Sequence, residues 1–290
     1  MRALSEKNPI AVFFYFLAAA GLVMFHMNPV LVGISLIGAL SYLFVTGRQK
    51  KSQLWLVLLF LGMAVVNPLF YHNGKTVLFV LNDNPVTWEA TVWGAVSGGM
   101  LVAVTVWFLH FSSMMTADKL LYLFGSFSPK LSLILSMTLR YVPLFAAQSK
   151  KVNDVQTAMG LYKEDNIIDR FRGGIRIFSV MVTWSLENGI VTADSMTARG
   201  YGEGKRTFFS IFRFRLSDGV FLGVTAFFTA LVIFGMAMGA ADITFYPAIV
   251  METGGFFTYL TYSSYAALSL MPTVLELGVR FKWKYLQSKI

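Results

Sequence analysis

The stretch SLENGIVTADSMTARGYGEGKR, residues 185–206, decides how the fold of this chain is interpreted. It is too polar to cross a membrane, yet apolar segments of roughly spanning length lie before and after it. Helical spacing over residues 175–198 separates a polar side from an apolar side, which predicts a long amphipathic helix. The polar side carries Arg176, Ser179, Thr183, Glu187, Asp194 and Thr197, and the apolar side carries Phe178, Met181, Val182, Ser185, Gly189 and Met196. Small residues in the middle of the apolar side predict a close crossing with another helix.

The predicted helix ends at Ala198-Arg199-Gly200. Glycine is the usual residue just past a helix end, and a cation there suits the negative end of the helix dipole. An arginine that protrudes from such an end is well placed to enter an acidic groove of a partner. The alternative is that Arg199 only complements the dipole of its own helix.

The composition is that of a polytopic membrane protein. Of the 290 residues, 56% are hydrophobic and 13% are charged, whereas soluble domains have about 25% charged residues. The absence of cysteine excludes disulfides, thiolate catalysis and cysteine-ligated metals. The net charge of +9 is better explained by positive cytoplasmic loops than by nucleic-acid binding.

We predict about six transmembrane helices, with an N-terminal group of four in residues 1–111 and a C-terminal group of two in residues 219–290. The predicted spans are residues 10–27, 30–46, 54–70, 88–111, 220–239 and 256–277. Gly94, Gly98 and Gly99 offer a close-packing face within the fourth span. We interpret the apolar run 77–81 as loop or re-entrant structure, and residues 280–289 as a basic tail.

The distribution of lysine and arginine sets the predicted orientation. The external loops, residues 26–29, 71–87 and 240–255, contain only Lys75, and the other 23 of the 24 basic residues lie in predicted cytoplasmic segments. Because lysine and arginine favour the cytoplasmic side, both termini and residues 112–218 are expected to face the cytoplasm.

Residues 112–218 are predicted to form a cytoplasmic region of amphipathic helices. Residues 120–127 and 131–145 are expected to lie at the membrane interface, interrupted by Pro129, Arg140 and Pro143. A largely polar helix then ends at Ala158-Met159-Gly160, and residues 161–174 form a charged connector. The narrow stripe on that polar helix is Leu144, Gln148, Val152, Val155 and Met159.

The sequence contains no motif that predicts catalysis or a cofactor. The three histidines share no metal-ligand spacing, and neither a phosphate-binding loop nor a nucleophile elbow is present. A stand-alone carrier or channel needs polar residues along its spans, and a lipid enzyme needs a polar catalytic cluster at the interface. Both classes remain as alternatives, although these features are sparse.

Residues 193–207, ADSMTARGYGEGKRT, resemble the transmembrane T component of energy-coupling factor (ECF) transporters, of the EcfT or CbiQ type. Residues 139–143, LRYVP, match the family's arginine-aromatic-x-proline segment, and the similarity covers residues 148–161 and continues to residue 214. The family implies an all-α polytopic protein of a prokaryotic plasma membrane, with long cytoplasmic coupling helices.

The resemblance also implies a function and partners. The protein would be a non-catalytic subunit that links ATP hydrolysis by two ABC ATPase subunits to a substrate-binding S component, for uptake of a vitamin or a metal ion. The S component would choose the substrate, and the apolar face of the coupling helices would hold it. The remaining expected partner is membrane lipid, and neither a cofactor nor nucleic acid is expected.

The family's two ATPase-docking helix tips fall on particular residues of this chain. Ala198, Arg199 and Gly200 match the second tip, and Ala158, Met159 and Gly160 match the first. Methionine stands at the first tip where arginine is common, so that tip lacks a charge contact. Structural or interface roles are expected for Arg140, Pro143 and Tyr201, with binding of Arg140 to lipid phosphates as an equal alternative. Lys205, Arg206, Arg213 and Arg215 are expected to contact anionic lipid.

Overall fold

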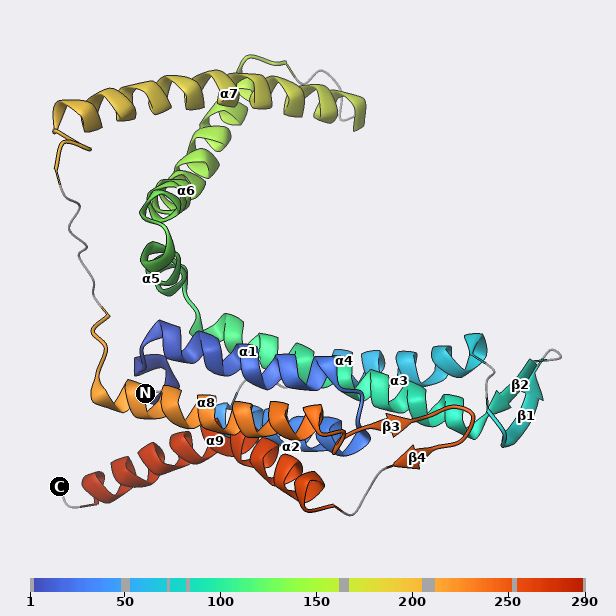
Figure 1. The fold of residues 1–290 in the computed structure, drawn as a ribbon. Coiled ribbons are helices and arrows are strands. Elements are labelled where there is room, and N and C mark those ends of the chain that lie inside the picture. The colour runs from blue at the N-terminus through green and yellow to red at the C-terminus, as the bar shows by residue number, and fades with distance from the viewer. Residues whose placement is uncertain are drawn as a thin grey trace. The chain divides into compact units, whose positions relative to one another are not determined.

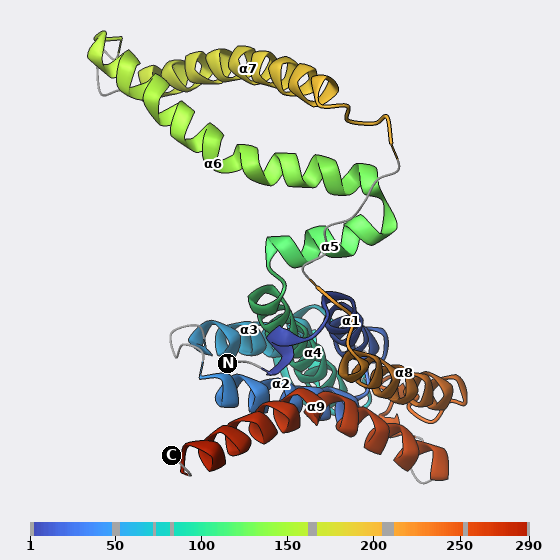
Figure 2. The same ribbon diagram turned by 90° about the vertical axis from the view of Figure 1, so that its left-hand side faces the viewer.

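The computed structural model describes residues 3–47, 53–71, 74–81, 84–161, 167–204, 212–251 and 255–288. These residues are mainly helical (Figures 1 and 2), which confirms the predicted all-α class. The helices are η1 (Ala3–Glu6), α1 (Pro9–Phe25), α2 (Pro29–Thr46), α3 (Gln53–Phe70), α4 (Trp88–Met114), α5 (Ala117–Phe127), α6 (Pro129–Ala158), α7 (Ile167–Ala198), α8 (Leu216–Ala237) and α9 (Phe256–Gln287), and the strands are β1 (Val77–Leu81), β2 (Asn84–Thr87), β3 (Ile243–Thr244) and β4 (Val250–Met251).

The chain forms two compact units. One, here called the bundle, comprises Met1–Thr116 and Phe212–Ile290, and the other, here called the middle unit, comprises Ala117–Ile211. In the bundle, α4 packs against α1 and α2, α1 packs against α8, and both α8 and α2 pack against α9. These contacts close a ring of five helices, and α3 packs on the outside of α4.

Several helices have the length and apolar composition of membrane spans. Among the described residues these are α2, α4, α8 and Lys130–Ala158 of α6, while α1 and Leu54–Phe70 of α3 are shorter apolar helices. The protein is therefore a polytopic membrane protein, as predicted. The segment of α6 was not among the predicted spans. Conversely, α9 is absent from this set because the side of α9 that packs inside the bundle carries buried serine, threonine and glutamate residues.

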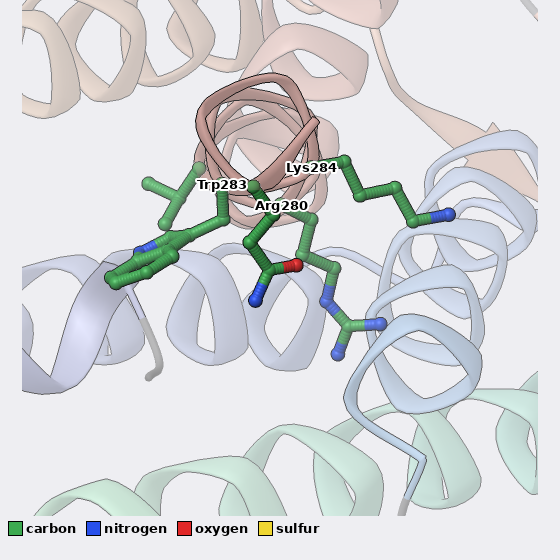
Figure 3. Close-up of a pocket in the computed structure, with 5 residues that line it drawn as sticks. Arg280, Trp283 and Lys284 are labelled. Atoms are coloured by element: carbon green, nitrogen blue, oxygen red, sulfur yellow. The ribbon is translucent and has the colours of Figure 1, made fainter. Parts of the chain in front are cut away.

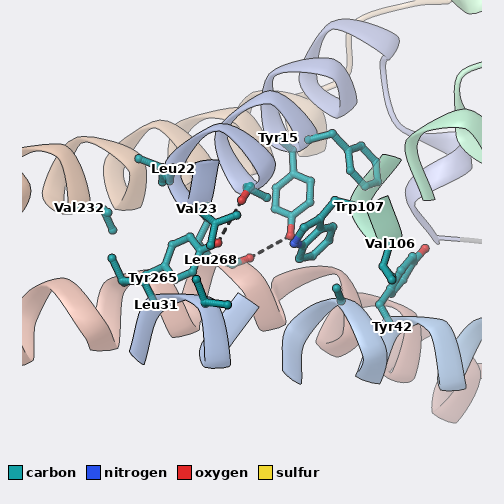
Figure 4. Packing of buried hydrophobic residues seen from close by; sticks show 14 of the residues in the cluster. Tyr15, Leu22, Val23, Leu31, Tyr42, Val106, Trp107, Val232, Tyr265 and Leu268 are labelled. Carbon is teal, nitrogen blue, oxygen red and sulfur yellow. Dashed lines mark hydrogen bonds between the residues drawn. The ribbon is translucent and has the colours of Figure 1, made fainter. Parts of the chain in front are cut away.

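The core of the bundle is joined by hydrogen bonds from aromatic side chains. The hydroxyl of Tyr15 donates to the carbonyl of Leu268 at 3.0 Å, and that of Tyr265 donates to the carbonyl of Ala19 at 3.0 Å (Figure 4). The indole nitrogen of Trp107 donates to Ser35 at 3.0 Å. In apolar surroundings a buried polar group without a partner is costly, so these bonds both satisfy the hydroxyls and tie the helices together.

Small residues allow the helices to approach closely, as the sequence predicts. A β-carbon at Gly98 would lie 3.0 Å from the carbonyl oxygen of Phe60, and one at Gly94 would lie 3.3 Å from that of Ala64. Both contacts are with the backbone of α3, so the predicted close packing is confirmed for these two glycines. Gly99, the third glycine of the prediction, faces Val32 of α2 instead. In the same way, Gly38 of α2 lies close to the backbone of α9 at Ser269.

The segment between α3 and α4 contains a β-hairpin, so the prediction of loop or re-entrant structure for residues 77–81 is wrong. The run VLFVL is rich in strand-forming residues, and it pairs antiparallel with Asn84–Thr87. The carboxylate of Glu89, in the first turn of α4, accepts hydrogen bonds at 3.3 Å from the backbone amide of Thr76. This contact joins the hairpin to the start of α4.

Two helices extend beyond their predicted ends in the bundle. The last helix continues past residue 277 to Gln287, so most of the predicted basic tail is helical. The helix α8 begins at Leu216, where Asp218 accepts from the backbone amide of Arg215 at 3.1 Å. Asp218 also pairs with Lys7 at 3.6 Å, which joins the start of α8 to the N-terminal segment.

Candidate functional site

The helix α6 runs without a break from Pro129 to Ala158, so the predicted interfacial segment 131–145 and the polar helix that follows it form one helix, with Pro143 inside it. Proline has no amide hydrogen, and within a helix it removes one backbone bond and bends the axis. Figure 2 shows α6 changing direction along its length. Both Pro143 and Arg140 are exposed on the surface of this helix.

The helix α7 begins at Ile167, earlier than residue 175 where the sequence predicts it. The charged connector predicted for residues 161–174 is therefore wrong from residue 167 onward, and residues 162–166 lie outside the described part of the chain. Two adjacent glycines, Gly173 and Gly174, disfavour a helix by roughly 1 kcal/mol each. Gly173 is nevertheless buried within α7. Asp169 in the first turn suits the positive end of the helix dipole.

The two long helices of the middle unit meet through aromatic and polar side chains. The hydroxyl of Tyr141 on α6 lies 3.0 Å from that of Thr192 on α7. One turn further along α6, the ring of Phe145 packs edge to face against Trp184, with centroids 5.5 Å apart. Figure 1 shows α7 lying across α6. These contacts hold the two helices at a defined crossing.

The side of α7 that faces α6 differs from the predicted one. Met181, Ser185 and Met196 are partly covered, as predicted, but Phe178 is 70% exposed and a β-carbon at Gly189 would meet nothing within 4 Å. Trp184 and Thr192 provide the inward contacts instead. The bulk of the aromatic rings sets the distance between these helices, so the small residues do not mediate a close crossing.

The end of α7 forms a Schellman motif around the predicted Ala-Arg-Gly sequence. Gly200 has a positive φ of 72° and its amide donates to the carbonyl of Thr197 at 2.9 Å. The amide of Tyr201 donates to the carbonyl of Met196 at 3.0 Å. These bonds satisfy carbonyl groups that otherwise have no partner at a helix end. The predicted end of the helix at Arg199 is confirmed.

The end of α6 has the same backbone arrangement. Gly160 has a φ of 65° and donates to Thr157 at 3.0 Å, and Leu161 donates to Gln156 at 3.2 Å. Met159 occupies the position that Arg199 holds on α7. The middle unit thus presents two helix ends of one geometry that differ in the side chain at the cap.

Both cap side chains are exposed. Met159 is 62% exposed, and Arg199 is exposed together with Tyr201, which is 44% exposed. Within the described residues, no acidic side chain pairs with Arg199. A guanidinium group in this position is able to form two parallel hydrogen bonds with a carboxylate of another molecule. The methionine offers apolar contact only.

The other predicted contact residues are divided between the units. Lys205 and Arg206 lie outside the described residues, whereas Arg213 and Arg215 belong to the bundle, where Arg215 precedes α8. Among the described residues, no group of three or more histidine, aspartate or glutamate side chains is arranged to hold a metal ion.

An exposed apolar stripe runs along α7, and the sequence reasoning found only part of it. Its members recur at intervals of three and four residues, which places them on one face of the helix. The sequence contains this spacing, but the charged residues between positions 161 and 174 favoured the prediction of a connector there instead of a helix. The stripe consists of Ile168 (64% exposed), Phe171 (70%), Ile175 (53%), Phe178 (70%) and Val182 (41%).

Comparison with known proteins relates the chain to one group of transporter subunits. No family model matches it. It is 26% identical over 217 residues to the energy-coupling factor transporter transmembrane protein EcfT 1 of Listeria monocytogenes, covering 69% of this chain and 77% of that protein. It is 27% identical over 191 residues to EcfT of Listeria innocua, covering 60% and 68%, and 24% identical over 195 residues to EcfT of Thermotoga maritima, covering 63% and 69%. With its all-α membrane fold, the chain is therefore similar to the energy-coupling factor transporter transmembrane proteins named EcfT.

Proposed function

We propose that this chain is the transmembrane coupling subunit of an ECF-type ABC importer. It links ATP hydrolysis by two ATPase subunits to a substrate-binding S component that takes up a vitamin or a metal ion. The observation that carries the proposal is the pair of exposed helix ends, Ala158-Met159-Gly160 and Ala198-Arg199-Gly200, with one backbone geometry. Two equivalent ends fit two ATPase subunits, one on each.

The crossing of α6 and α7 provides a route from the ATPases to the membrane. When the ATPase subunits close on ATP, they move the two helix ends relative to each other. Because Phe145 and Trp184 pack face to edge and Tyr141 bonds to Thr192, the two helices respond together at their crossing. In this proposal the chain catalyses no reaction itself, and it transmits the movement of the ATPase subunits toward the membrane.

The apolar stripe of α7 is the surface that we assign to the S component. Its five side chains stand at the spacing by which a helix presents one face to a partner. In water such a surface is unfavourable, and contiguous exposed apolar patches commonly mark interaction sites. The S component, a membrane protein, would cover it.

The chain alone is expected to hydrolyse no ATP. When it carries an affinity tag and is purified in mild detergent, two ATP-hydrolysing subunits and a small membrane protein are expected to accompany it. ATPase activity is then expected in the complex and absent once the chain is separated by a second purification step. Turnover that stays with the isolated chain at the level of the complex would contradict the proposal.

Both termini and the middle unit are proposed to lie in the cytoplasm. Because the chain has no cysteine, each engineered cysteine is the only thiol in its variant. Cysteines at Glu6, Glu203 and Ser288 are expected to resist a membrane-impermeant thiol reagent in intact cells and to react after lysis. Cysteines at Thr76 and Thr244 are expected to react from outside. Labelling of position 203 in intact cells would refute the orientation.

A further inference from the structure

The last part of α9 alternates basic and aromatic residues in the sequence VRFKWKYLQ, residues 279–287. Because the segment is helical, Arg280 and Lys284 stand one turn apart on the same side. Lys282 lies about 160–200° around the helix from them, at 100° per residue. Two cations therefore share one side of α9, and the third points elsewhere.

A pocket of about 520 Å³ lies against this part of α9, and both of these cations line it (Figure 3). Figure 3 shows Arg280 and Lys284 extending toward one side of α9 and Trp283 toward the other. The described residues that line it offer two positive charges, an indole N–H group and a side-chain amide, and they include no carboxylate. The lining residues are Val279, Arg280, Trp283, Lys284 and Gln287.

A buried carboxylate holds one of these cations in place. Glu276 is 1% exposed, and its Oε1 atom lies 3.6 Å from the Nε atom of Arg280, whose side chain is 51% exposed. The ion pair engages the inner nitrogen of the guanidinium group. The two terminal nitrogens, which form the planar fork that binds phosphate oxygens, remain for a ligand.

The aromatic residues of this part of α9 indicate its depth in the membrane. Phe281 is 68% exposed, Trp283 47% and Tyr285 61%. Tryptophan and tyrosine gather where the apolar interior of a membrane meets the headgroups, because their rings are amphipathic. The preceding part of α9 packs in the bundle against α2 and α8. Arg280 and Lys284 thus lie in the last turns of a bundle helix, next to aromatic residues of the kind found at a membrane surface.

We propose that this side of α9 binds the phosphate group of an anionic phospholipid. Arg280 and Lys284 contact the phosphate, Trp283 lies at the junction of headgroup and acyl chain, and Glu276 positions Arg280. Anionic lipids attract basic residues close to the end of a membrane helix. In the orientation proposed above, the lipid belongs to the cytoplasmic leaflet. The site goes beyond the coupling function and does not depend on it.

The test is a lipid titration of the full-length chain in detergent, read by native mass spectrometry. Dioleoylphosphatidylglycerol is compared with dioleoylphosphatidylcholine and with free glycerol 3-phosphate. We expect the anionic lipid to bind in preference to both. Lys284→Gln is expected to weaken its binding about fivefold, which corresponds to 1 kcal/mol for one cation near an anionic surface. Lys284→Arg keeps the charge and is expected to keep the binding.

Lys282→Gln is the matched control, because it removes the same charge from the same helix on the side away from the pocket. It is expected to change the affinity by less than about twofold. An equal loss in Lys282→Gln and Lys284→Gln would show a diffuse attraction to positive charge and overturn the site. Equal binding of phosphatidylcholine, or binding of glycerol 3-phosphate as tight as that of the lipid, would overturn the assignment of an anionic lipid.

Discussion

Replacement of Arg199 by glutamate is expected to disrupt ATPase binding and to abolish most substrate uptake. The side chain is exposed at the end of α7, on a backbone turn that Gly200 maintains. If it enters an acidic groove, the substitution places like charges together in a site that excludes water. Loss of one partner of a buried charge pair at an interface costs about 2–5 kcal/mol. The measurement is a pull-down of the ATPase subunits with each variant, together with uptake of the cognate substrate in cells.

Met159→Ala is the matched variant at the other helix end. The backbone bonds at Gly160 and Gly200 follow the same pattern, so the two variants test side chains in equivalent positions. Removal of methionine contacts costs about 1–3 kcal/mol if the side chain is fully buried by the partner. The loss is therefore expected to be smaller than in Arg199→Glu. Added salt is expected to weaken the contact of Arg199 more than that of Met159.

Arg199→Gln separates the loss of attraction from the gain of repulsion. A glutamate at a helix C-terminus also opposes the helix dipole by about 0.3–1 kcal/mol, and glutamine does not. We expect Arg199→Gln to bind the ATPases less tightly than the parent and more tightly than Arg199→Glu. If Arg199→Glu binds and transports like the parent, Arg199 is only a helix cap and the docking role is wrong.

The helix ends could be predicted from the sequence because local residues determine them. A glycine after an amphipathic helix adopts positive φ at no steric cost, so Gly160 and Gly200 fix the ends of α6 and α7 without help from distant residues. The glycine face of α4 was readable for a related reason. Gly94 and Gly98 lie one turn apart on one side of a membrane helix, and small residues at that spacing have few uses other than close packing.

Other features could not be predicted because tertiary contacts overrule local preference. Pro143 and the pair Gly173-Gly174 disfavour a helix locally, yet α6 and α7 continue through them. The crossing of these helices is set by Trp184 and Phe145, whose pairing joins residues far apart in the sequence. The hairpin was missed for a different reason, since a short apolar run is ambiguous between strand and loop without its partner.

The ring of bundle helices could be predicted only in part. The apolar lengths indicate which segments are candidates to span the membrane, but they do not say which helices are neighbours. The bonds of Tyr15 to Leu268 and of Tyr265 to Ala19 join α1 and α9, which are not adjacent in the ring, and each joins residues that no local pattern relates. The serine and threonine residues of α9 lower its hydropathy because they are polar, and within the bundle they face α2 and α8.

Gly38→Ala is expected to lower the stability of the bundle by about 1–3 kcal/mol, the usual cost of overpacking. A β-carbon at this position would lie 2.7 Å from the Cβ atom of Ser269 and 2.8 Å from its carbonyl oxygen. The carbonyl belongs to the backbone of α9, so it moves only if the whole helix moves. One turn later, the hydroxyls of Ser41 and Thr273 lie 3.1 Å apart, and a displaced α9 would stretch this contact as well. The measurement is thermal unfolding of the purified protein in detergent, in which a lower midpoint is expected.

Gly33→Ala in the same helix separates steric overlap from helix propensity. A β-carbon at Gly33 meets nothing within 4 Å. Alanine is favoured over glycine within a helix by roughly 0.5–1 kcal/mol, so this variant is expected to unfold at the parent temperature or above it. The two substitutions are chemically identical and lie in one helix, so a difference between them measures the space at Gly38. If both variants unfold at the same temperature, the close approach of α2 and α9 at Gly38 does not limit the stability of the bundle.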